Sequence, residues 1–308
     1  MYSLNLKLLM FLFILLVPYP KGFASSSTFS ISGNWQKSEL VKLKIKHSQE
    51  NTIQGQNMKM ISTKNVEIKI LDKDTSGYRI EWWYKTAKLE GIENPAQKAM
   101  TDFAVGVKVI FLTDTNGKFK YLDNIYAIQR HLKKGLEKFE KKAGDEKMEY
   151  IAKQLKLLIE TRDAINEAFS KEIILYYNYY GEIFKKDSTI ILETKLPNPL
   201  GGESFPGTLF VKVDSVNFEN NYCKIGSRLE LDKEKTNAIF LNMYRQVYKQ
   251  AGKPEPSAKD IPKVNVKDVS TSIFDLKSGW NKKTYIKREI NSKDLKQIES
   301  FDFSISVK

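Results

Sequence analysis

Residues 41–46 read Val-Lys-Leu-Lys-Ile-Lys, a strict alternation of apolar and cationic side chains. Successive side chains of a β-strand point to opposite faces of a sheet, so this stretch predicts a strand with one buried and one hydrated face. Val41, Leu43 and Ile45 would face a core, and the three lysines would face solvent. Such a pattern favours an antiparallel sheet that is covered on one side only.

Further alternating segments surround this stretch and are joined by turn sequences. They cover residues 57–62, 66–70, 78–85, 105–112 and 118–122. The connection at 72–77 is rich in Asp, Ser and Gly, and Asn116-Gly117 supplies the positive φ that a tight strand reversal requires. Short turns between consecutive strands make the neighbours antiparallel. The first third of the chain is therefore predicted to form an antiparallel meander.

The apolar spacing changes from two to three and four between residues 123 and 181. This spacing predicts two amphipathic helices, and the short joint at Ala143-Gly144 makes them an antiparallel hairpin. Asp123 and Asp145 stand where helix N-caps belong. The end of the second helix, residues 173–180, is dense in aromatic and β-branched side chains and suits a strand equally well.

Strands resume after this helical insertion. They are predicted at residues 188–194, 208–214, 222–231, 266–276, 284–290 and 301–307, with a third helix at 233–252. The predicted fold class is α+β: a large, curved antiparallel β-sheet, a meander like half a barrel, with the inserted helical hairpin and the third helix packed on one face. We find no linker-like tract, so residues 25–308 are predicted to form one domain.

The first 24 residues predict a secretory signal peptide. Lys7 precedes an apolar run over residues 8–17, and the small residues Gly22 and Ala24 would stand at −3 and −1 before the cut. A membrane anchor needs about 20 apolar residues, so this run is too short for one, and no later segment is apolar enough to span a membrane. We expect cleavage after Ala24 and a mature protein in the periplasm, outside the cell or at its surface.

The composition excludes several kinds of function. The chain has 308 residues, 50 Lys and Arg against 37 Asp and Glu, and a net charge of +13. Only six of the cations are arginine, the side chain that phosphate and base recognition favours, and the lysines are spread along the chain. We therefore expect no nucleic-acid partner. One cysteine cannot form an internal disulfide, and two histidines argue against zinc sites and His-based triads.

The motifs of common catalytic sites are missing from the sequence. It has no Gly-x-Ser-x-Gly elbow, and segment 72–77 resembles an EF-hand opening but has Trp83 where the loop needs Glu. Cys223 lies on the apolar side of a strand, and His47 and His131 lack an evident carboxylate partner. No catalytic, cofactor-binding or metal-ligating residues are assigned, which favours a non-enzymatic protein. Paired carboxylates of a glycosidase cannot be recognised in a sequence, because their separation is three-dimensional.

Two small groups of residues are candidates for ligand binding. Trp83 shares a strand face with Arg79 and Lys85, and it is predicted to form an aromatic platform for a sugar, a peptide or a partner protein. The alternative is a Trp packed under a neighbouring helix or loop. Met58 and Met60 are predicted to line an adaptable apolar cavity, or else to be part of the core.

The high strand content and three sequence stretches are the basis for comparing this chain with a known family. These are Leu-Pro-Asn-Pro-Leu-Gly-Gly-Glu at 196–203, Asp-Leu-Lys-Ser-Gly-Trp at 275–280 and Tyr-Ile-Lys-Arg-Glu-Ile at 285–290. The chain resembles a family of secreted, β-rich envelope proteins of unknown function that is common in Bacteroidetes-like genomes. Its architecture is distantly similar to periplasmic lipoprotein carriers of the LolA type. The resemblance implies a signal peptide and a β-rich envelope domain, and it brings no catalytic residues or cofactors.

Three hypotheses of function follow from the sequence. The first is a non-enzymatic module that binds an apolar, lipid-like ligand or a protein partner between sheet and helices. The second is an envelope glycan hydrolase that uses a pair of acidic side chains. The third is a docking protein of an envelope assembly that uses the Trp83 face. No cofactor is expected, and the oligomeric state is left open.

Overall fold

The computed structural model describes residues 28–306, apart from positions 54, 92–94, 142–145, 197–202, 251, 253, 255, 258–263 and 294. The predicted signal peptide therefore lies outside the described residues, as do Asp145 and most of the Pro/Gly-rich loop that follows Leu196. Among the described helices, none has both the length and the apolar composition that crossing a membrane requires.

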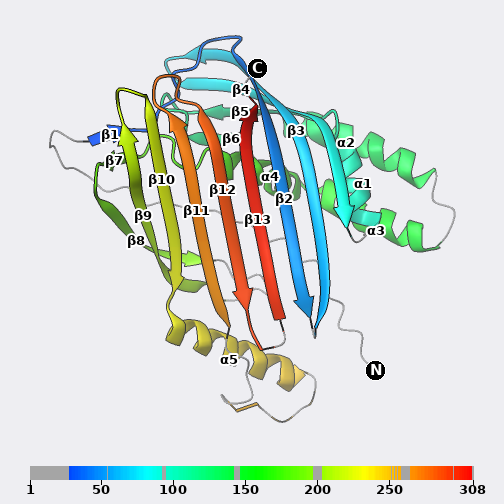
Figure 1. Cartoon of the computed structure of the whole chain (residues 1–308). Coiled ribbons are helices and arrows are strands. Elements are labelled where there is room, and N and C mark those ends of the chain that lie inside the picture. Colours follow the sequence, from blue (N-terminus) through cyan, green and yellow to red (C-terminus); the bar gives the residue numbers. More distant parts are fainter. Residues whose placement is uncertain are drawn as a thin grey trace.

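Eleven strands form one antiparallel sheet, which confirms the predicted α+β class and the large meander. Their order across the sheet is β6-β5-β4-β3-β2-β13-β12-β11-β10-β9-β8 (Figure 1). The strands are β2 (Leu40–Ile53), β3 (Gln56–Asp74), β4 (Gly77–Gly91), β5 (Lys108–Thr113), β6 (Phe119–Leu122), β8 (Thr189–Leu196), β9 (Phe205–Asn217), β10 (Tyr222–Leu231), β11 (Asn265–Asp275), β12 (Asn281–Asn291) and β13 (Leu295–Ser306). A separate pair consists of β1 (Thr28–Ser30) and β7 (Ile183–Lys185).

Two meanders meet in this sheet where β2 pairs with β13. The N-terminal meander runs from β2 outward to β6, and the C-terminal meander runs from β13 outward to β8. Leu43 lies opposite Ile305 and Ile45 opposite Phe303, so the strand that predicted the fold is central to the sheet. The segments predicted at 57–62 and 66–70 are parts of one long strand, β3. Side-chain alternation continues through the polar residues between them.

Five helices are described: α1 (Pro95–Ala104), α2 (Ile125–Glu140), α3 (Glu146–Glu160), α4 (Arg162–Tyr176) and α5 (Lys233–Gln250). The sequence did not predict α1, and the predicted two-helix hairpin is in fact three helices. The second predicted helix breaks at Thr161, whose backbone is extended (φ −97°, ψ 143°) and whose side chain accepts a hydrogen bond from Ala164 N at 3.2 Å. A Thr at this position caps a new helix instead of continuing the old one. Asp123 is not the N-cap of α2, because Asn124 takes that position.

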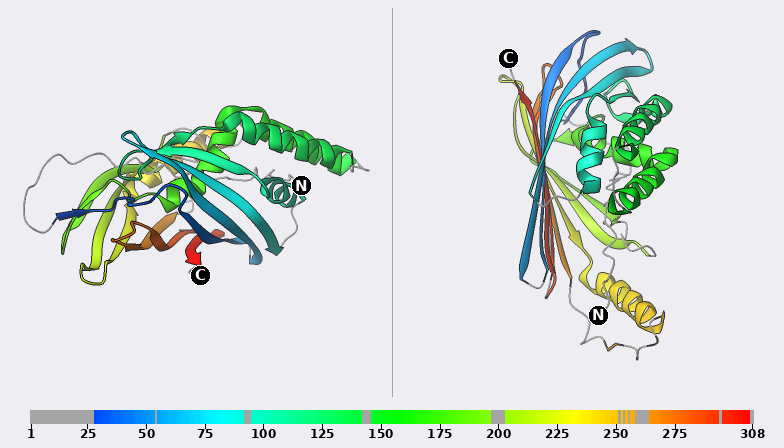
Figure 2. Two further views of the ribbon diagram at one scale, coloured as in Figure 1. Left: turned by 90° about the horizontal axis from the view of Figure 1, so that it is seen from above. Right: turned by 90° about the vertical axis from the view of Figure 1, so that its right-hand side faces the viewer.

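The helices lie on one side of the sheet. In the side view of Figure 2, α1 to α4 cover one half of this side, and α5 lies near the opposite end of the strands. We call this side the inner face, and its buried residues include Leu43, Ile45, Val66 and Trp82. The other side is the outer face, to which the exposed lysines of β2 point. Sheet and helices share one hydrophobic core, because α4 and the inner face contribute to the same cluster of buried side chains.

Candidate functional site

The helix-covered half of the inner face is filled by an aromatic cluster. The cluster consists of Trp35, Tyr78, Trp82, Phe111, Tyr176, Tyr177, Tyr180, Trp280 and Phe303, which are all buried. The Trp35 ring lies 4.9 Å from Tyr78, 4.9 Å from Trp280 and 5.2 Å from Tyr180, measured between ring centroids. Such tilted and edge-on pairs pack densely and add to the burial energy. This half of the space between sheet and helices is therefore core.

Hydrogen bonds attach the tyrosines after α4 to the turn between β11 and β12. Tyr176 donates its hydroxyl to the Asn281 carbonyl at 2.6 Å, and Tyr180 donates to the Gly279 carbonyl at 2.6 Å. Asn281 Nδ2 donates back to the Tyr176 carbonyl at 2.9 Å. Burial raises the pKa of Tyr176 and of Tyr180 well above the usual range, so both hydroxyls stay protonated donors. Residues 173–180 suited a helix or a strand in the sequence. In the structure they are helical up to Tyr176, the end of α4, and then form a turn that the Tyr180 hydrogen bonds hold in place.

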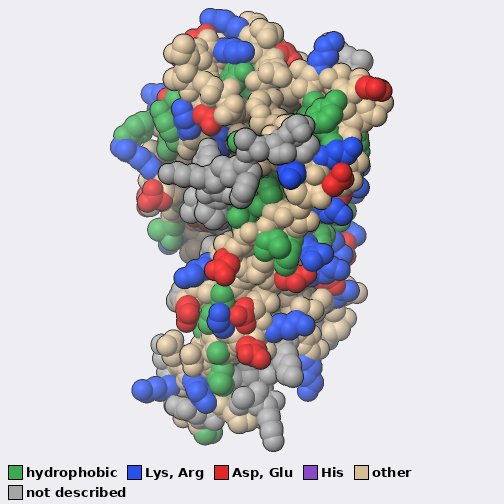
Figure 3. Space-filling model, turned by 90° about the vertical axis from the view of Figure 1, so that its left-hand side faces the viewer, with side chains coloured by type: hydrophobic (Ala, Val, Ile, Leu, Met, Phe, Trp, Pro, Cys, Tyr) green, Lys and Arg blue, Asp and Glu red, His purple; other side chains and the backbone are tan. Residues whose placement is uncertain are grey.

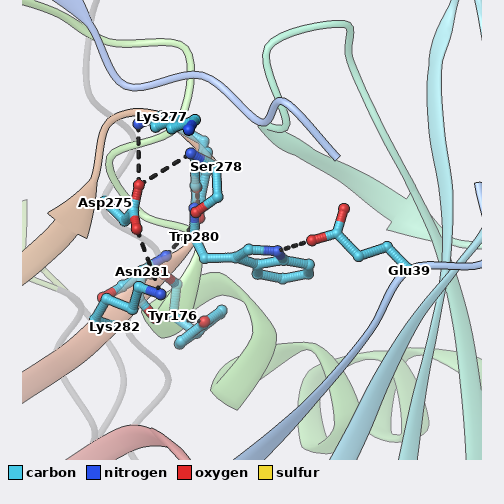
Figure 4. Close-up of polar contacts among 10 residues, drawn as sticks. Glu39, Tyr176, Asp275, Lys277, Ser278, Trp280, Asn281 and Lys282 are labelled. Carbon is cyan, nitrogen blue, oxygen red and sulfur yellow. Dashed lines mark hydrogen bonds and ion pairs between the residues drawn. The ribbon is translucent and has the colours of Figure 1, made fainter. Parts of the chain in front are cut away.

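The 275–280 turn closes this end of the cluster (Figure 4). Asp275 accepts backbone hydrogen bonds from Lys277 and Ser278 at 3.0 Å, and the Trp280 indole N–H donates to Glu39 at 2.6 Å. A pocket of about 280 Å³ opens beside the turn, next to residues 30–34. Ligand pockets for drug-sized molecules span about 300–1,000 Å³, so this recess is slightly smaller than the smallest of them.

A belt of charged side chains crosses the inner face where the aromatic cluster ends. We call it the charged belt, and it consists of His47, Lys64, Lys171, Glu172, Asp268, Arg288 and Glu299. Lys171 and Glu172 belong to α4, and the others belong to β2, β3, β11, β12 and β13. The belt therefore joins the helical layer to the middle of the sheet.

One part of the belt is centred on Glu172. Its carboxylate lies 2.6 Å from Lys64 Nζ and accepts a hydrogen bond from the Tyr84 hydroxyl at 3.0 Å. Burial opposes ionisation of this carboxyl, but Lys64, the charge of His47 and the Tyr84 hydrogen bond together outweigh burial, so the pKa of Glu172 is lowered. Burial and the nearby Glu172 charge raise the pKa of Tyr84 well above its usual value. Glu172 is thus an ionised acceptor that fixes α4 to β3 and β4.

The centre of the belt is Glu299 of β13. Its Oε1 lies 2.9 Å from His47 Nε2 and 3.2 Å from Lys171 Nζ, and the imidazole stacks on Phe301 with 4.1 Å between centroids. Burial raises the energy of the charged carboxylate, but these two partners over-compensate and lower its pKa to about 2. His47 is therefore a half-buried member of this network in the middle of β2, and it has a carboxylate partner that was not evident in the sequence.

The third part of the belt is a buried ion pair between strands. Arg288 Nε donates to Asp268 Oδ1 at 2.8 Å, and Arg288 Nη2 donates to Oδ2 of the same carboxylate. Burial raises the pKa of the Asp268 carboxyl, and Arg288 opposes that rise. In the sheet register Arg288 lies directly between Asp268 and Glu299. The guanidinium thus connects two strands that carry acidic side chains.

The chemistry available to the belt is limited by this pairing. Its three carboxylates, Glu172, Asp268 and Glu299, are each ion-paired with a lysine or an arginine. A glycosidase needs one protonated and one free carboxylate across a cleft, and these residues do not provide that pair. The part of the chain that the structure describes also contains no group of three or more His, Cys, Asp or Glu side chains arranged to hold a metal ion.

The inner face continues beyond the belt toward α5. Met58 and Met60 of β3, Val266 of β11 and Ile290 of β12 point to this side and are all partly exposed. We call these four residues the lower inner face. Helix α5 contacts β9 at the far end, where Phe240 stacks on Phe205 with 4.9 Å between centroids. Apolar side chains are thus accessible between α4 and α5.

The structure places the predicted binding residues on opposite faces of the sheet. Met58 and Met60 belong to the lower inner face, whereas Trp83, Arg79 and Lys85 lie on the outer face. The two groups therefore do not form one site. Their roles in binding remain predictions.

Trp83 is half-buried beneath cations on the outer face. Lys85 Nζ lies 3.2 Å and Lys108 Nζ 4.3 Å from the centre of its ring. Arg79 forms an ion pair with Asp123 at 3.0 Å instead of contacting the indole. These lysines occupy positions that a stacking ligand would use, so a ligand on Trp83 would have to displace them.

Sequence reasoning did not identify the charged belt, although one signal was available. Arg288 lies two residues from both Ile286 and Ile290 on β12, so its side chain points to the same face of the sheet as theirs. A charged side chain therefore stands where the alternation predicts an apolar one. A charge at an inward position requires a buried partner. Its partner, Asp268, is 20 residues away along the chain, and the partners of Glu299 are further still. Their proximity depends on strand pairing that local patterns do not encode.

Comparison with known proteins finds no match in sequence, and the matches among solved structures have low TM-scores and low sequence identity. No family model and no curated protein matches the chain, so the family resemblance inferred from the sequence stays a prediction. A solved structure described as "lipid-protein interactions in lipovitellin" aligns with a TM-score of 0.43 and 6% identity over 88% of this chain and 25% of that chain. This chain thus spans about a quarter of that protein. DynF of the dynemicin pathway of Micromonospora chersina aligns with a TM-score of 0.19 and 5% identity, covering 93% and 88% of the two chains.

Proposed function

We propose that this protein is a non-enzymatic module that binds an apolar, lipid-like ligand on the lower inner face. One observation carries the proposal: four apolar side chains of the inner face are partly exposed between α4 and α5, namely Met58, Met60, Val266 and Ile290. On the half of the inner face that α1 to α4 cover, by contrast, the apolar side chains of β3, β4 and β5 are buried. Apolar surface that remains accessible in a concave region is typical of ligand sites.

The surroundings of the lower inner face suit such a ligand. The two methionines are flexible and polarisable, so they can adapt to chains of different shape. The charged belt lies along one side of this surface and supplies polar groups next to the apolar ones. A ligand with an aliphatic body would lie against the strands, and a polar end would meet the belt.

The other two hypotheses are supported less well. The ion pairing of all three belt carboxylates argues against a glycan hydrolase with an acidic pair at this place. The docking hypothesis relies on Trp83, whose ring is already contacted by Lys85 and Lys108. Binding of a protein partner to the lower inner face is the form of the docking hypothesis that the exposed apolar residues favour.

We also propose that the chain is exported, as its N-terminal sequence predicts. The short apolar run after Lys7 and the small residues before the expected cut support this proposal. N-terminal sequencing of the protein recovered from the periplasm or medium of the expressing cell tests it. A product that retains residues 1–24 in the cytosol would refute it.

The ligand proposal is tested by extracting the natively purified protein and by titration with a dansyl-labelled fatty acid. We expect copurifying lipid in the mass spectrum and a saturable increase in dansyl fluorescence. Met60→Asp should weaken probe binding at least tenfold, because a charge in the apolar surface costs more than about 1.4 kcal/mol. The matched control is Ile191→Asp, since Ile191 is 62% exposed on the outer face. Absence of lipid and of saturable binding, or equal weakening by both variants, would refute the proposal.

A further inference from the structure

We propose that the outer face, around β2, β13 and β12, binds anionic phospholipid surfaces. This inference goes beyond ligand binding on the inner face and does not depend on it. Figure 1 looks onto the outer face, with these three strands side by side. The lysine cluster that carries the proposal consists of Lys42, Lys44 and Lys46 on β2 and Lys283 on β12, all of them exposed.

Strand geometry brings these four ammonium groups together. Residues two apart on a strand are separated by roughly 7 Å, so the lysines of β2 form a row. In the register Lys44 lies opposite Ser304, and Ser304 lies opposite Lys283 on the next strand. Ser306 lies opposite Lys42, so small hydroxyl side chains separate the cations. The result is a row of three cations on β2 with a fourth cation two strands away on β12, all on the outer face.

The cluster carries charge that the described part of the protein does not neutralise. No ion pair joins any of its four lysines to a described carboxylate, whereas the outer-face acids Glu67, Glu81, Asp214 and Glu289 each pair with another lysine. Two further acids lie beside the cluster: Asp302, opposite Lys46, is half-buried, and Glu90, whose pKa is lowered by Lys88 and to a smaller extent by Lys46, forms its ion pair with Lys88. Like charges at this spacing repel, and an anionic partner would relieve the repulsion. On the side shown in Figure 3, by contrast, cations and anions are interspersed over the described surface.

Two exposed apolar side chains select a lipid surface over other polyanions. Leu40, at the start of β2, is 47% exposed, and Tyr285, beside Lys283 on β12, is 39% exposed. Lysine ammonium groups at the level of lipid headgroups, with a tyrosine and an aliphatic side chain next to them, are typical of membrane-surface contacts. Recognition of nucleic acid would favour arginine and a groove-filling element, whereas this cluster consists of lysines on strands.

The experiment is flotation with vesicles of phosphatidylcholine alone and of two parts phosphatidylcholine to one part phosphatidylglycerol. We expect the protein to float with the anionic vesicles only and to be released when salt is raised, since screening weakens exposed charges. Lys42→Gln/Lys44→Gln/Lys46→Gln should weaken partitioning about 100-fold, at about fivefold for each lysine near the surface. These side chains are exposed, so the variant should fold, which circular dichroism verifies.

The matched control is Lys133→Gln/Lys134→Gln/Lys138→Gln on α2, which removes the same charge from exposed positions on the helical side. It should change partitioning by less than twofold. Three outcomes would overturn the proposal: no flotation of the unmodified protein with anionic vesicles, equal loss in both triple variants, or binding to duplex DNA without binding to vesicles. Loss of vesicle binding with intact dansyl-probe binding would show that the two surfaces act independently.

Discussion

The buried carboxylate of Glu299 makes the free energy of unfolding of this protein depend on pH in the acidic range. Glu299 is 8% exposed and is held ionised by His47 and Lys171, which lower its pKa from 4.5 to about 2. The lowered pKa corresponds to about 3 kcal/mol of folding free energy. Because the folded-state pKa is lowered, this contribution is complete above the unfolded pKa of 4.5 and is lost as the pH falls through the folded pKa. At pH 3 we expect roughly 2 kcal/mol of it to be lost.

The perturbation that isolates this contribution is Glu299→Gln, measured by urea unfolding at a series of pH values. The variant should be less stable than the unmodified protein at pH 7 by about 3 kcal/mol, and the difference should narrow to about 1 kcal/mol at pH 3. Glu137→Gln, which removes an exposed charge from α2, serves as the control and should change stability by less than about 0.5 kcal/mol. A difference between Glu299→Gln and the unmodified protein that stays constant from pH 7 to pH 3 would refute the reasoning.

Three more predictions concern the core and the turn at its end. Arg288→Met leaves Asp268 buried without its cation, so the free energy of unfolding measured in urea should fall by about 3–5 kcal/mol. Adding Asp268→Leu should restore most of that loss, and no recovery in the double variant would contradict the ion-pair explanation. Gly279→Ala should lower stability by about 1–3 kcal/mol, because φ is +73° and a Cβ would meet the Ser32 carbonyl oxygen; an unchanged melting temperature would contradict this. Cys223, whose pKa burial raises to about 12, should react with Ellman's reagent at pH 8 only after denaturant is added, and fast labelling of the folded protein would show that the thiol is accessible.

Part of the candidate site could be predicted from the sequence, and part could not. Met58 and Met60 are an even number of residues from Val66 on the same strand, so the sequence predicts that they point to the same face as Val66. Trp83 is an odd number of residues from the buried Trp82 and Tyr84, so the sequence predicts that it points to the opposite, outer face. What no pattern shows is that Lys108, on a different strand, lies over the indole, or that His47 meets a carboxylate 252 residues away. These contacts depend on strand pairing and on the packing of α4.

The alternation in residues 41–46 and the turn sequences after it determined the local structure, because the direction of each side chain along a strand depends only on the backbone repeat. The change of spacing after residue 123 determined helices in the same way. The tertiary structure alone decided that β2 pairs with β13, that the second predicted helix breaks at Thr161, and that inward charges meet across the sheet. The physical reason is that pairing between distant strands and the neutralisation of buried charge are collective properties of the folded chain, whereas periodicity is a property of each short segment by itself.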